Sequence, residues 1–254
     1  MILESFSLKG RNALVTGSST GLGAAMAIAL AQAGASVVIH GRNESRIEEV
    51  CAAIQQAGGK AVRAVADVSD ATACEGLIEL AIRELGSLDI LINNAGIIRR
   101  TPAADYSLKD WTDVLETNLN AVFRLCQMAG RHMLARGSGK IVNIASLLSF
   151  QGGVLVPAYA AAKGAVAQLT KALANEWAPR GVNVNAIAPG YMETDVTTAL
   201  RADPVRSRQI LERIPAGRWG TPQDLAGAAV FLASAASDYL HGHVLVVDGG
   251  WMAR

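Results

Sequence analysis

Apolar residues recur along this chain in two alternating patterns. Longer segments in which they return every three to four positions predict helices at Leu22–Ala33, Glu44–Ala57, Ala71–Leu85, Leu108–Ala135, Ala158–Trp177 and Pro222–Ala233. Short runs rich in β-branched residues predict strands at Ala13–Thr16, Ser36–His40, Ala61–Ala66, Ile90–Asn93, Lys140–Ala145, Asn183–Ile187 and Val244–Val247. Strands that alternate with helices indicate βαβ units, and therefore a parallel sheet covered on both faces.

Right-handed crossovers leave few topologies for such a chain, and they favour one doubly wound α/β domain of the Rossmann type over residues 1–254. The region from Gly190 to Gly220 breaks the alternation. It carries two short helical patterns near Asp195–Arg201 and Pro204–Arg213 and follows a strand, at the sheet edge where ligands bind in these folds. We expect it to form a substrate lid; an ordinary surface insertion is the alternative.

Composition narrows the choice of partner. Of the 254 residues, 51% are hydrophobic and 18% are charged, and the formal net charge is +1. Since no run of Lys or Arg suggests nucleic acid or a membrane surface, we expect a small-molecule partner. The start of the chain lacks a signal-peptide pattern and no apolar stretch approaches the ~20 residues that span a bilayer, so we expect a cytoplasmic protein. Cys51, Cys74 and Cys126 match no metal-ligand or disulfide pattern, and we expect neither a disulfide nor a metal site.

A glycine-rich loop joins the first predicted strand to the first helix. Its sequence, T-G-S-S-T-G-L-G, covers Thr16 to Gly23. Glycine permits a close backbone approach to a ligand, and the helix start offers free N–H groups to a pyrophosphate. A glycine cluster alone is weak evidence, but its place in a βαβ chain makes a dinucleotide site specific. The residues expected to hold the cofactor here are Gly17, Ser19, Thr20, Gly21, Leu22 and Gly23.

The end of the second strand decides between two cofactors. An acidic residue there would accept hydrogen bonds from the ribose of NAD, whereas an arginine would face the 2′-phosphate of NADP. The chain has His40-Gly41-Arg42-Asn43, without an acid. Because a guanidinium suits phosphate geometry, we predict NADP(H) held by Arg42. NAD(H), with Arg42 as a solvated turn residue, stays open.

Tyr159 and Lys163 lie four residues apart at the start of a predicted helix, so both can reach one cavity. A nearby cation lowers the pKa of a tyrosine, which favours proton exchange. Ser146 follows the fifth strand, where its hydroxyl could donate to a carbonyl oxygen. Asn118 lies within a helical pattern that suits Asn poorly, and Asn93-Asn94-Ala95-Gly96 follow the fourth strand.

Together these residues resemble the short-chain dehydrogenase/reductase family, whose members carry T-G-x-x-x-G-x-G, N-N-A-G, an Asn, a Ser and Y-x-x-x-K in this order. The resemblance covers essentially the whole chain. It implies that Tyr159 is the general acid/base, that Ser146 polarises the carbonyl, that Lys163 binds the nicotinamide ribose and tunes Tyr159, and that Asn118 holds a water relaying protons to Lys163. It also implies cofactor contacts from Asp67, Val68, Asn94, Ala95, Gly96, Tyr159, Lys163, Pro189, Gly190, Met192 and Thr194.

Finer features are similar to the 2-dehydro-3-deoxy-D-gluconate 5-dehydrogenases (or 2-deoxy-D-gluconate 3-dehydrogenases) and the gluconate 5-dehydrogenases of this family. They include I-I-R-R at 97–100, S-F-Q-G-G at 149–153 and the run from Ile214 to Gly220. The resemblance implies a sugar-acid substrate. Arg99 or Arg100 could bind its carboxylate and Gln151 a hydroxyl, beside Ser146 and Tyr159; the arginine pair could instead form structural ion pairs.

Two other functions stay in competition. A 3-oxoacyl-[acyl-carrier-protein] reductase should carry a basic patch for its acidic partner, and Arg99, Arg100, Arg201, Arg206, Arg208 and Arg213 could supply one. A non-catalytic NADP sensor is the alternative from another class, although the chain keeps Ser, Tyr and Lys. The family resemblance further implies a homotetramer packed through the two long helices, Leu108–Ala135 and Ala158–Trp177.

Overall fold

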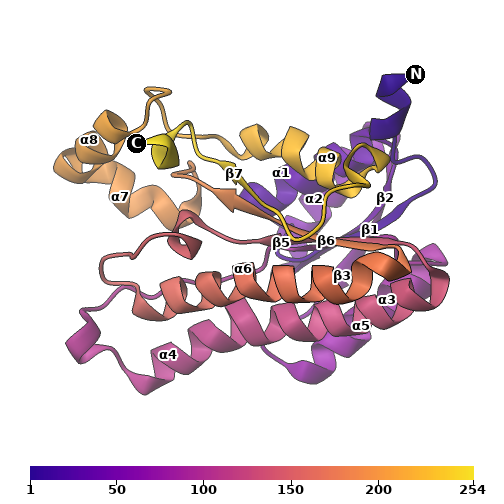
Figure 1. Ribbon diagram of the computed structural model, residues 1–254, viewed down its shortest axis with the longest axis horizontal. Coiled ribbons are helices and arrows are strands. Elements are labelled where there is room, and N and C mark those ends of the chain that lie inside the picture. The colour runs from indigo at the N-terminus through magenta and orange to yellow at the C-terminus, as the bar shows by residue number, and fades with distance from the viewer.

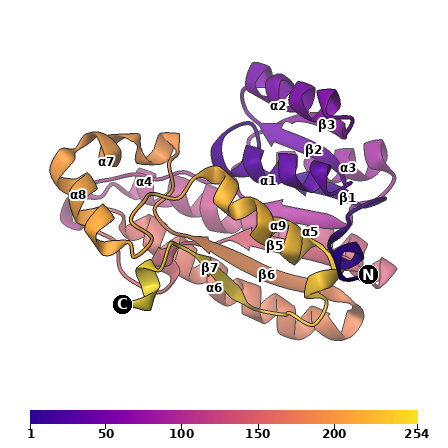
Figure 2. The ribbon, with the colours of Figure 1, turned by 90° about the horizontal axis from the view of Figure 1, so that it is seen from above.

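A computed structural model describes all 254 residues. Its seven strands are all parallel and form one sheet in the order β3-β2-β1-β4-β5-β6-β7 (Figures 1 and 2). They are β1 Asn12–Val15, β2 Ser36–Gly41, β3 Lys60–Val65, β4 Ile90–Asn93, β5 Gly139–Ile144, β6 Val182–Pro189 and β7 Val244–Val247. The predicted doubly wound parallel sheet is confirmed, and each predicted strand lies within two residues of the observed one.

Helices cover both faces of the sheet (Figure 1). They are α1 Gly21–Gln32, α2 Glu44–Gln56, α3 Ala71–Leu85, α4 Leu108–Leu115, α5 Ala121–Arg136, α6 Pro157–Trp177, α7 Thr198–Ala202, α8 Pro204–Arg213 and α9 Ala226–Ala233. Alternation along the strands makes two cores: Ala13 and Val15 of β1 pack with α1, α2 and α9, while Leu14 packs with α3, α5 and α6. Burial on both faces explains why the strands are almost continuously apolar.

The strand order reverses between β1 and β4. From β1 the chain moves outward through β2 and β3, then returns to the other side of β1 and continues from β4 to β7. Loops that leave the two neighbouring carboxyl ends diverge at this point, which opens a crevice there. The topology thus brings the glycine loop after β1 and the N-N-A-G segment after β4 together.

The predicted helix over Leu108–Ala135 has an interruption. A five-residue π-helical turn, Glu116–Asn120, separates α4 from α5. Such turns insert a residue into the helical ladder and change the direction of a side chain. Here the turn contains Asn118, which is fully buried.

The region from Gly190 to Gly220 stands beside the sheet and contains α7 and α8 (Figure 2). Its two ends are joined, because Met192 and Gly220 form a bridge and the Glu193 N–H donates to the Gly220 carbonyl at 2.7 Å. A small apolar cluster attaches it to the rest of the chain through Leu147 and Trp251. None of the helices is both long enough and apolar enough to cross a membrane.

Candidate active site

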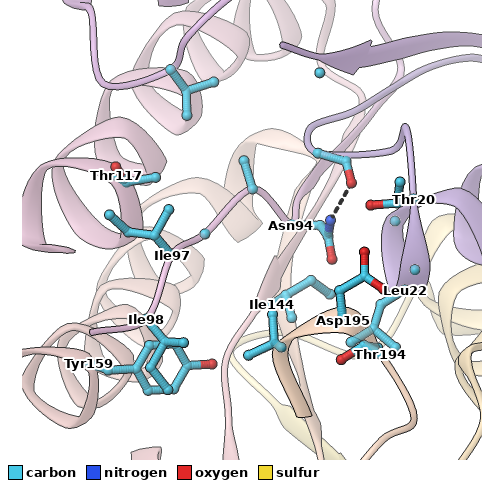
Figure 3. Close-up of a pocket in the computed structure, with 18 of the residues that line it drawn as sticks. Thr20, Leu22, Asn94, Ile97, Ile98, Thr117, Ile144, Tyr159, Thr194 and Asp195 are labelled. Carbon is cyan, nitrogen blue, oxygen red and sulfur yellow. Dashed lines mark hydrogen bonds between the residues drawn. The ribbon is translucent and has the colours of Figure 1, made fainter. Parts of the chain in front are cut away.

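A cleft of about 780 Å³ opens at the carboxyl ends of the central strands. Every residue that the sequence assigned to the cofactor borders it. In Figure 3, Thr20 and Leu22 of the glycine loop lie on one side, Tyr159 lies on the other, and Thr194 and Asp195 come from the segment after β6. The cleft therefore joins the predicted cofactor residues to the predicted catalytic residues.

The glycine loop is shaped by close backbone contacts. Gly17 has φ +63°, a conformation that favours glycine. A Cβ on Gly23 would lie 2.2 Å from the carbonyl oxygen of Gly17, so no side chain fits there. The Asn94 amide donates to the carbonyls of Thr16 and Gly17, both at 3.0 Å, and fastens the loop to the segment after β4 (Figure 3). These contacts fix the position of the loop at the edge of the cleft.

The first turn of α1 faces the same cleft. Thr20 occupies the N-cap position, but its side chain makes no capping hydrogen bond. The first N–H groups of the helix, with the positive end of its dipole, are thus available to a ligand. This uncapped helix start and the glycine cradle fit the pyrophosphate of a dinucleotide.

His40 has a role that the sequence did not reveal. One ring nitrogen, Nδ1, accepts from the Gly17 N–H at 3.0 Å, and the other, Nε2, lies 3.2 Å from the Ala66 carbonyl. Burial lowers the pKa of His40 to about 4, so the ring is neutral. Because its Nδ1 must then accept, Nε2 carries the proton and donates to Ala66. The only sequence signal is a polar residue at the buried end of a strand.

Arg42 lies at the cleft, 71% exposed, with Nη1 3.4 Å from Oδ2 of Asp67. Hydrogen bonds from the backbone and side chain of Ser69, followed by the charge of Arg42, hold the pKa of Asp67 below its usual value. Asn43 caps α2 by accepting from the Arg46 N–H. The turn after β2 therefore presents a cation, and no carboxylate ends the strand.

Lys163 is anchored in the wall of the cleft. It is buried, and its Nζ donates to the carbonyl of Ile144 at 2.5 Å. Burial lowers its pKa to about 8. The ammonium stands 5.6 Å from the ring centre of Tyr159. One helical turn thus brings both side chains to the end of β5, as the sequence spacing predicted.

The pKa of Tyr159 differs from the sequence expectation. Burial raises it, while a hydrogen bond with Ser146 and the charge of Arg100 offset part of that rise. From the sequence, the charge of Lys163 is expected to lower this pKa. In the structure, desolvation of the phenolate has the larger effect and raises it.

Asn118 lies behind the cleft wall and does not border it. Its Oδ1 accepts from the Ile97 N–H and its Nδ2 donates to the Ile97 carbonyl, both at 2.8 Å. The Asn118 side chain thus pairs with the backbone N–H and carbonyl of Ile97, just after the N-N-A-G segment, as a neighbouring strand would. The π turn directs Asn118 at this segment, which explains why an Asn occurs inside the helical pattern.

The predicted substrate residues separate. Arg99 borders the cleft but lies 3.4 Å from Asp110. Arg100 is next to the cleft rim, where its Nη2 lies 3.4 Å from the Val196 carbonyl and its charge reaches Tyr159. Gln151 lies outside the cleft, and its Oε1 accepts from Trp251 at 3.4 Å. Gln151 thus contacts the C-terminal segment in this structure, and its contact with a sugar hydroxyl stays a prediction.

Comparison with known proteins agrees with this geometry. A family model described as enoyl-(acyl carrier protein) reductase matches residues 17–252. The 2-dehydro-3-deoxy-D-gluconate 5-dehydrogenase of Dickeya dadantii is 53% identical to this chain over 100% of both chains. The enzyme of the same name from Bacillus subtilis is 54% identical over 99% of this chain and 98% of the relative. A solved gluconate 5-dehydrogenase of Burkholderia cenocepacia, in complex with NADP and tartrate, is 44% identical over 100% of both chains, with a TM-score of 0.96.

Proposed function

Because this chain belongs to the short-chain dehydrogenase/reductase family, we propose that it is an NADP-dependent oxidoreductase that interconverts a secondary alcohol and a ketone on a sugar acid. The observation that carries the proposal is the convergence of Ser146, Tyr159 and Lys163 on the wall of a dinucleotide-shaped cleft. A binding protein without catalysis would not need a buried lysine beside a partly buried phenol, since removing such groups from water costs stability. The sensor alternative is therefore disfavoured.

The cofactor fits the residues present. The glycine cradle and the first turn of α1 suit its pyrophosphate, Asp67 and Val68 the adenine, and Pro189, Gly190, Met192 and Thr194 the nicotinamide end. Arg42 suits the 2′-phosphate, which favours NADP(H) over NAD(H), and the Burkholderia relative was solved with NADP. When bound, the cofactor supplies or accepts the hydride.

The side chains handle the proton and the oxygen. In ketone reduction, the Tyr159 hydroxyl donates its proton to the carbonyl oxygen; in alcohol oxidation, it takes the proton back. Ser146 donates a hydrogen bond to the same oxygen and stabilises the charge that develops there. Lys163, whose Nζ donates to the Ile144 carbonyl, would hold the nicotinamide ribose, and it places a cation near Tyr159. Asn118 holds the backbone just after the N-N-A-G segment through its two hydrogen bonds with Ile97.

The substrate assignment rests on the relatives' names and on one free cation. Arg99 is already matched by Asp110, whereas Arg100 has no acidic partner and contacts only a backbone carbonyl of the segment after β6. We assign Arg100 as the group that binds the carboxylate of a 2-keto-3-deoxygluconate, 2-deoxygluconate or gluconate type of substrate. Arg201 lies near Glu193 (3.9 Å) and Arg213 stacks over Trp251 (4.1 Å), which weakens the case for a patch that binds an acidic carrier protein.

The test is steady-state reduction of keto sugar acids, and oxidation of gluconate, with NADPH and NADH side by side. Tyr159→Phe is the blank. We expect turnover that prefers NADPH and disappears in the blank. A preference for NADH would overturn the role of Arg42 alone. Turnover of 3-oxoacyl thioesters, with none of sugar acids, would replace the substrate assignment.

Three further assignments accompany this function. We propose that residues 190–220 act as a lid, since they border the cleft through Thr194 to Thr197 and are joined to the sheet by a narrow stem. We also propose a cytoplasmic homotetramer that packs through α5 and α6. Small exposed residues on α6, including Ala161 and Ala172, would permit close approach of a second copy.

A further inference from the structure

Ser149 lies in the short helical turn Leu147–Ser149 that follows β5. Its hydroxyl makes two hydrogen bonds, one as acceptor and one as donor. It accepts from the Ser146 N–H at 3.3 Å and donates to the main-chain carbonyl of Lys163 at 2.6 Å. One side chain that borders no part of the cleft thus links the backbones of two proposed active-site residues.

The link closes a ring of hydrogen bonds. Lys163 is tied to the end of β5 by its Nζ, which donates to the Ile144 carbonyl at 2.5 Å. It is tied a second time by its own carbonyl, through Ser149, to the N–H of Ser146. The Ser146 Oγ is further held by the Leu148 N–H at 3.1 Å. Helix α6 and the turn that carries Ser146 are therefore fixed to each other at two points.

Of these two attachments, only the hydrogen bond to the Lys163 carbonyl depends on the Ser149 hydroxyl. The fold of the turn does not depend on it. Backbone bonds close the turn: the Ser149 N–H donates to Ser146 and the Phe150 N–H to Leu147, both at 2.9 Å. These bonds persist without the hydroxyl. Loss of the hydroxyl should therefore leave the turn formed but loosen its attachment to α6, because the hydrogen-bonded link from the Ser146 N–H to the Lys163 carbonyl is lost.

We propose that Ser149 is a positioning residue, which sets the place of the Ser146 hydroxyl relative to Tyr159 and Lys163. The inference rests on the proposed function, because it assigns Ser146 to the carbonyl oxygen. A donor that stabilises developing charge must be held to within a fraction of an ångström, and supporting hydrogen bonds supply that precision. Ser149 affects the rate through Ser146 and contacts neither substrate nor cofactor.

The variants are Ser149→Ala, Ser149→Thr as the conservative rescue, and Ser237→Ala as the matched control. Ser237 is buried and lies outside the cleft. Like that of Ser149, its hydroxyl contacts two backbone groups, here the carbonyls of Leu232 and Ser234, both at 3.1 Å. We expect Ser149→Ala to lower kcat by about 10- to 100-fold, as a misplaced donor does. The dissociation constant of Ser149→Ala for NADPH should stay within about twofold of that of wild type. Ser149→Thr should restore most of kcat. Ser237→Ala should keep the wild-type kcat despite a similar loss of stability.

An equal fall of kcat in Ser237→Ala, or a kcat of Ser149→Ala within twofold of wild type, would overturn the proposal. A crystal structure of Ser149→Ala provides a readout that needs no substrate. We expect the 146–149 turn to move relative to Lys163, and an unchanged position would also refute the inference. Failure of the proposed function looks different: wild type itself would then turn over no sugar acid, while the structural comparison still decides the role of Ser149.

Discussion

Tyr159 shows how several weak influences set the chemistry of one residue. Burial raises its pKa, and the hydrogen bond with Ser146 and the charge of Arg100 act in the opposite direction. Arg100 is the only one of these that can be removed without touching the proposed catalytic residues. Its side chain is exposed, so solvent screens its effect and the expected change is modest.

Arg100→Gln should shift the pH profile of ketone reduction. The reaction needs the protonated phenol, so kcat falls as pH rises through the pKa of Tyr159. Removal of a positive charge raises that pKa further, and the alkaline limb should move to higher pH. The measurement is kcat against pH at saturating substrate, since KM also depends on Arg100. Arg100→Lys should leave the limb in place; a limb that moves to lower pH in Arg100→Gln would contradict the argument.

His40 should make folding sensitive to acid. Its folded pKa is lowered to about 4 from 6.5, so the unfolded chain binds more protons between these values. Its contribution is fully present above about pH 6.5 and is lost as pH falls toward 4, by up to about 3 kcal/mol. Urea unfolding of wild type and His40→Asn at several pH values isolates this part. The stability difference between them should shrink as pH falls, and a constant difference would exclude His40 as its source.

Some individual residues could be assigned from the sequence and others could not. Tyr159 and Lys163 were predictable because their relation is local, four positions along one helix. His40 and Ser149 were not, because their partners lie far along the chain or on another element. The contact of Gln151 with Trp251 was not predictable either, because the two residues lie 100 positions apart.

At the scale of elements, periodicity located every strand but missed the π turn between α4 and α5. One inserted residue shifts the apolar pattern by about 100°, but α4 before it has only eight residues, too few to define the phase on that side. Poor helix propensity of Asn118 was the available sign, and the structure explains it by the two bonds with Ile97. The junction of β1 and α1 was predictable, because its geometry demands glycine at particular positions.

Gly23→Ala should weaken cofactor binding, whereas Gly76→Ala should stabilise the protein. A Cβ at Gly23 would meet the Gly17 carbonyl at 2.2 Å, so the glycine loop must shift, and affinity for NADPH should fall more than tenfold. Gly76 lies exposed inside α3 with open space around it, and Ala there should stabilise the protein by up to about 1 kcal/mol. Fluorescence titration with NADPH and thermal unfolding check the pair. Normal cofactor affinity in Gly23→Ala would refute the tight contact.

For the whole molecule, alternation and crossover handedness were enough to predict the sheet, since both follow from local sterics repeated along the chain. Association of copies is different, because a surface pattern does not tell which face is covered. Helix α5 exposes Phe123, which is 44% exposed, and α6 exposes small residues such as Ala161 and Ala172. Aromatic side chains are enriched at protein interfaces, so Phe123 is the side chain of α5 to test.

Phe123→Arg should therefore break the proposed tetramer. If α5 and α6 pack against their copies, the substitution buries two symmetry-related charges without partners, which costs several kcal/mol at each interface. Sedimentation equilibrium should then show dimers or monomers, while thermal unfolding of the dissociated chain remains cooperative. Leu3→Arg, on the N-terminal turn and 79% exposed, is the control and should keep the wild-type mass. A tetramer that survives Phe123→Arg would place the interface elsewhere, with the edge strand β7 as the next surface to test, because its outer backbone groups have no strand partner.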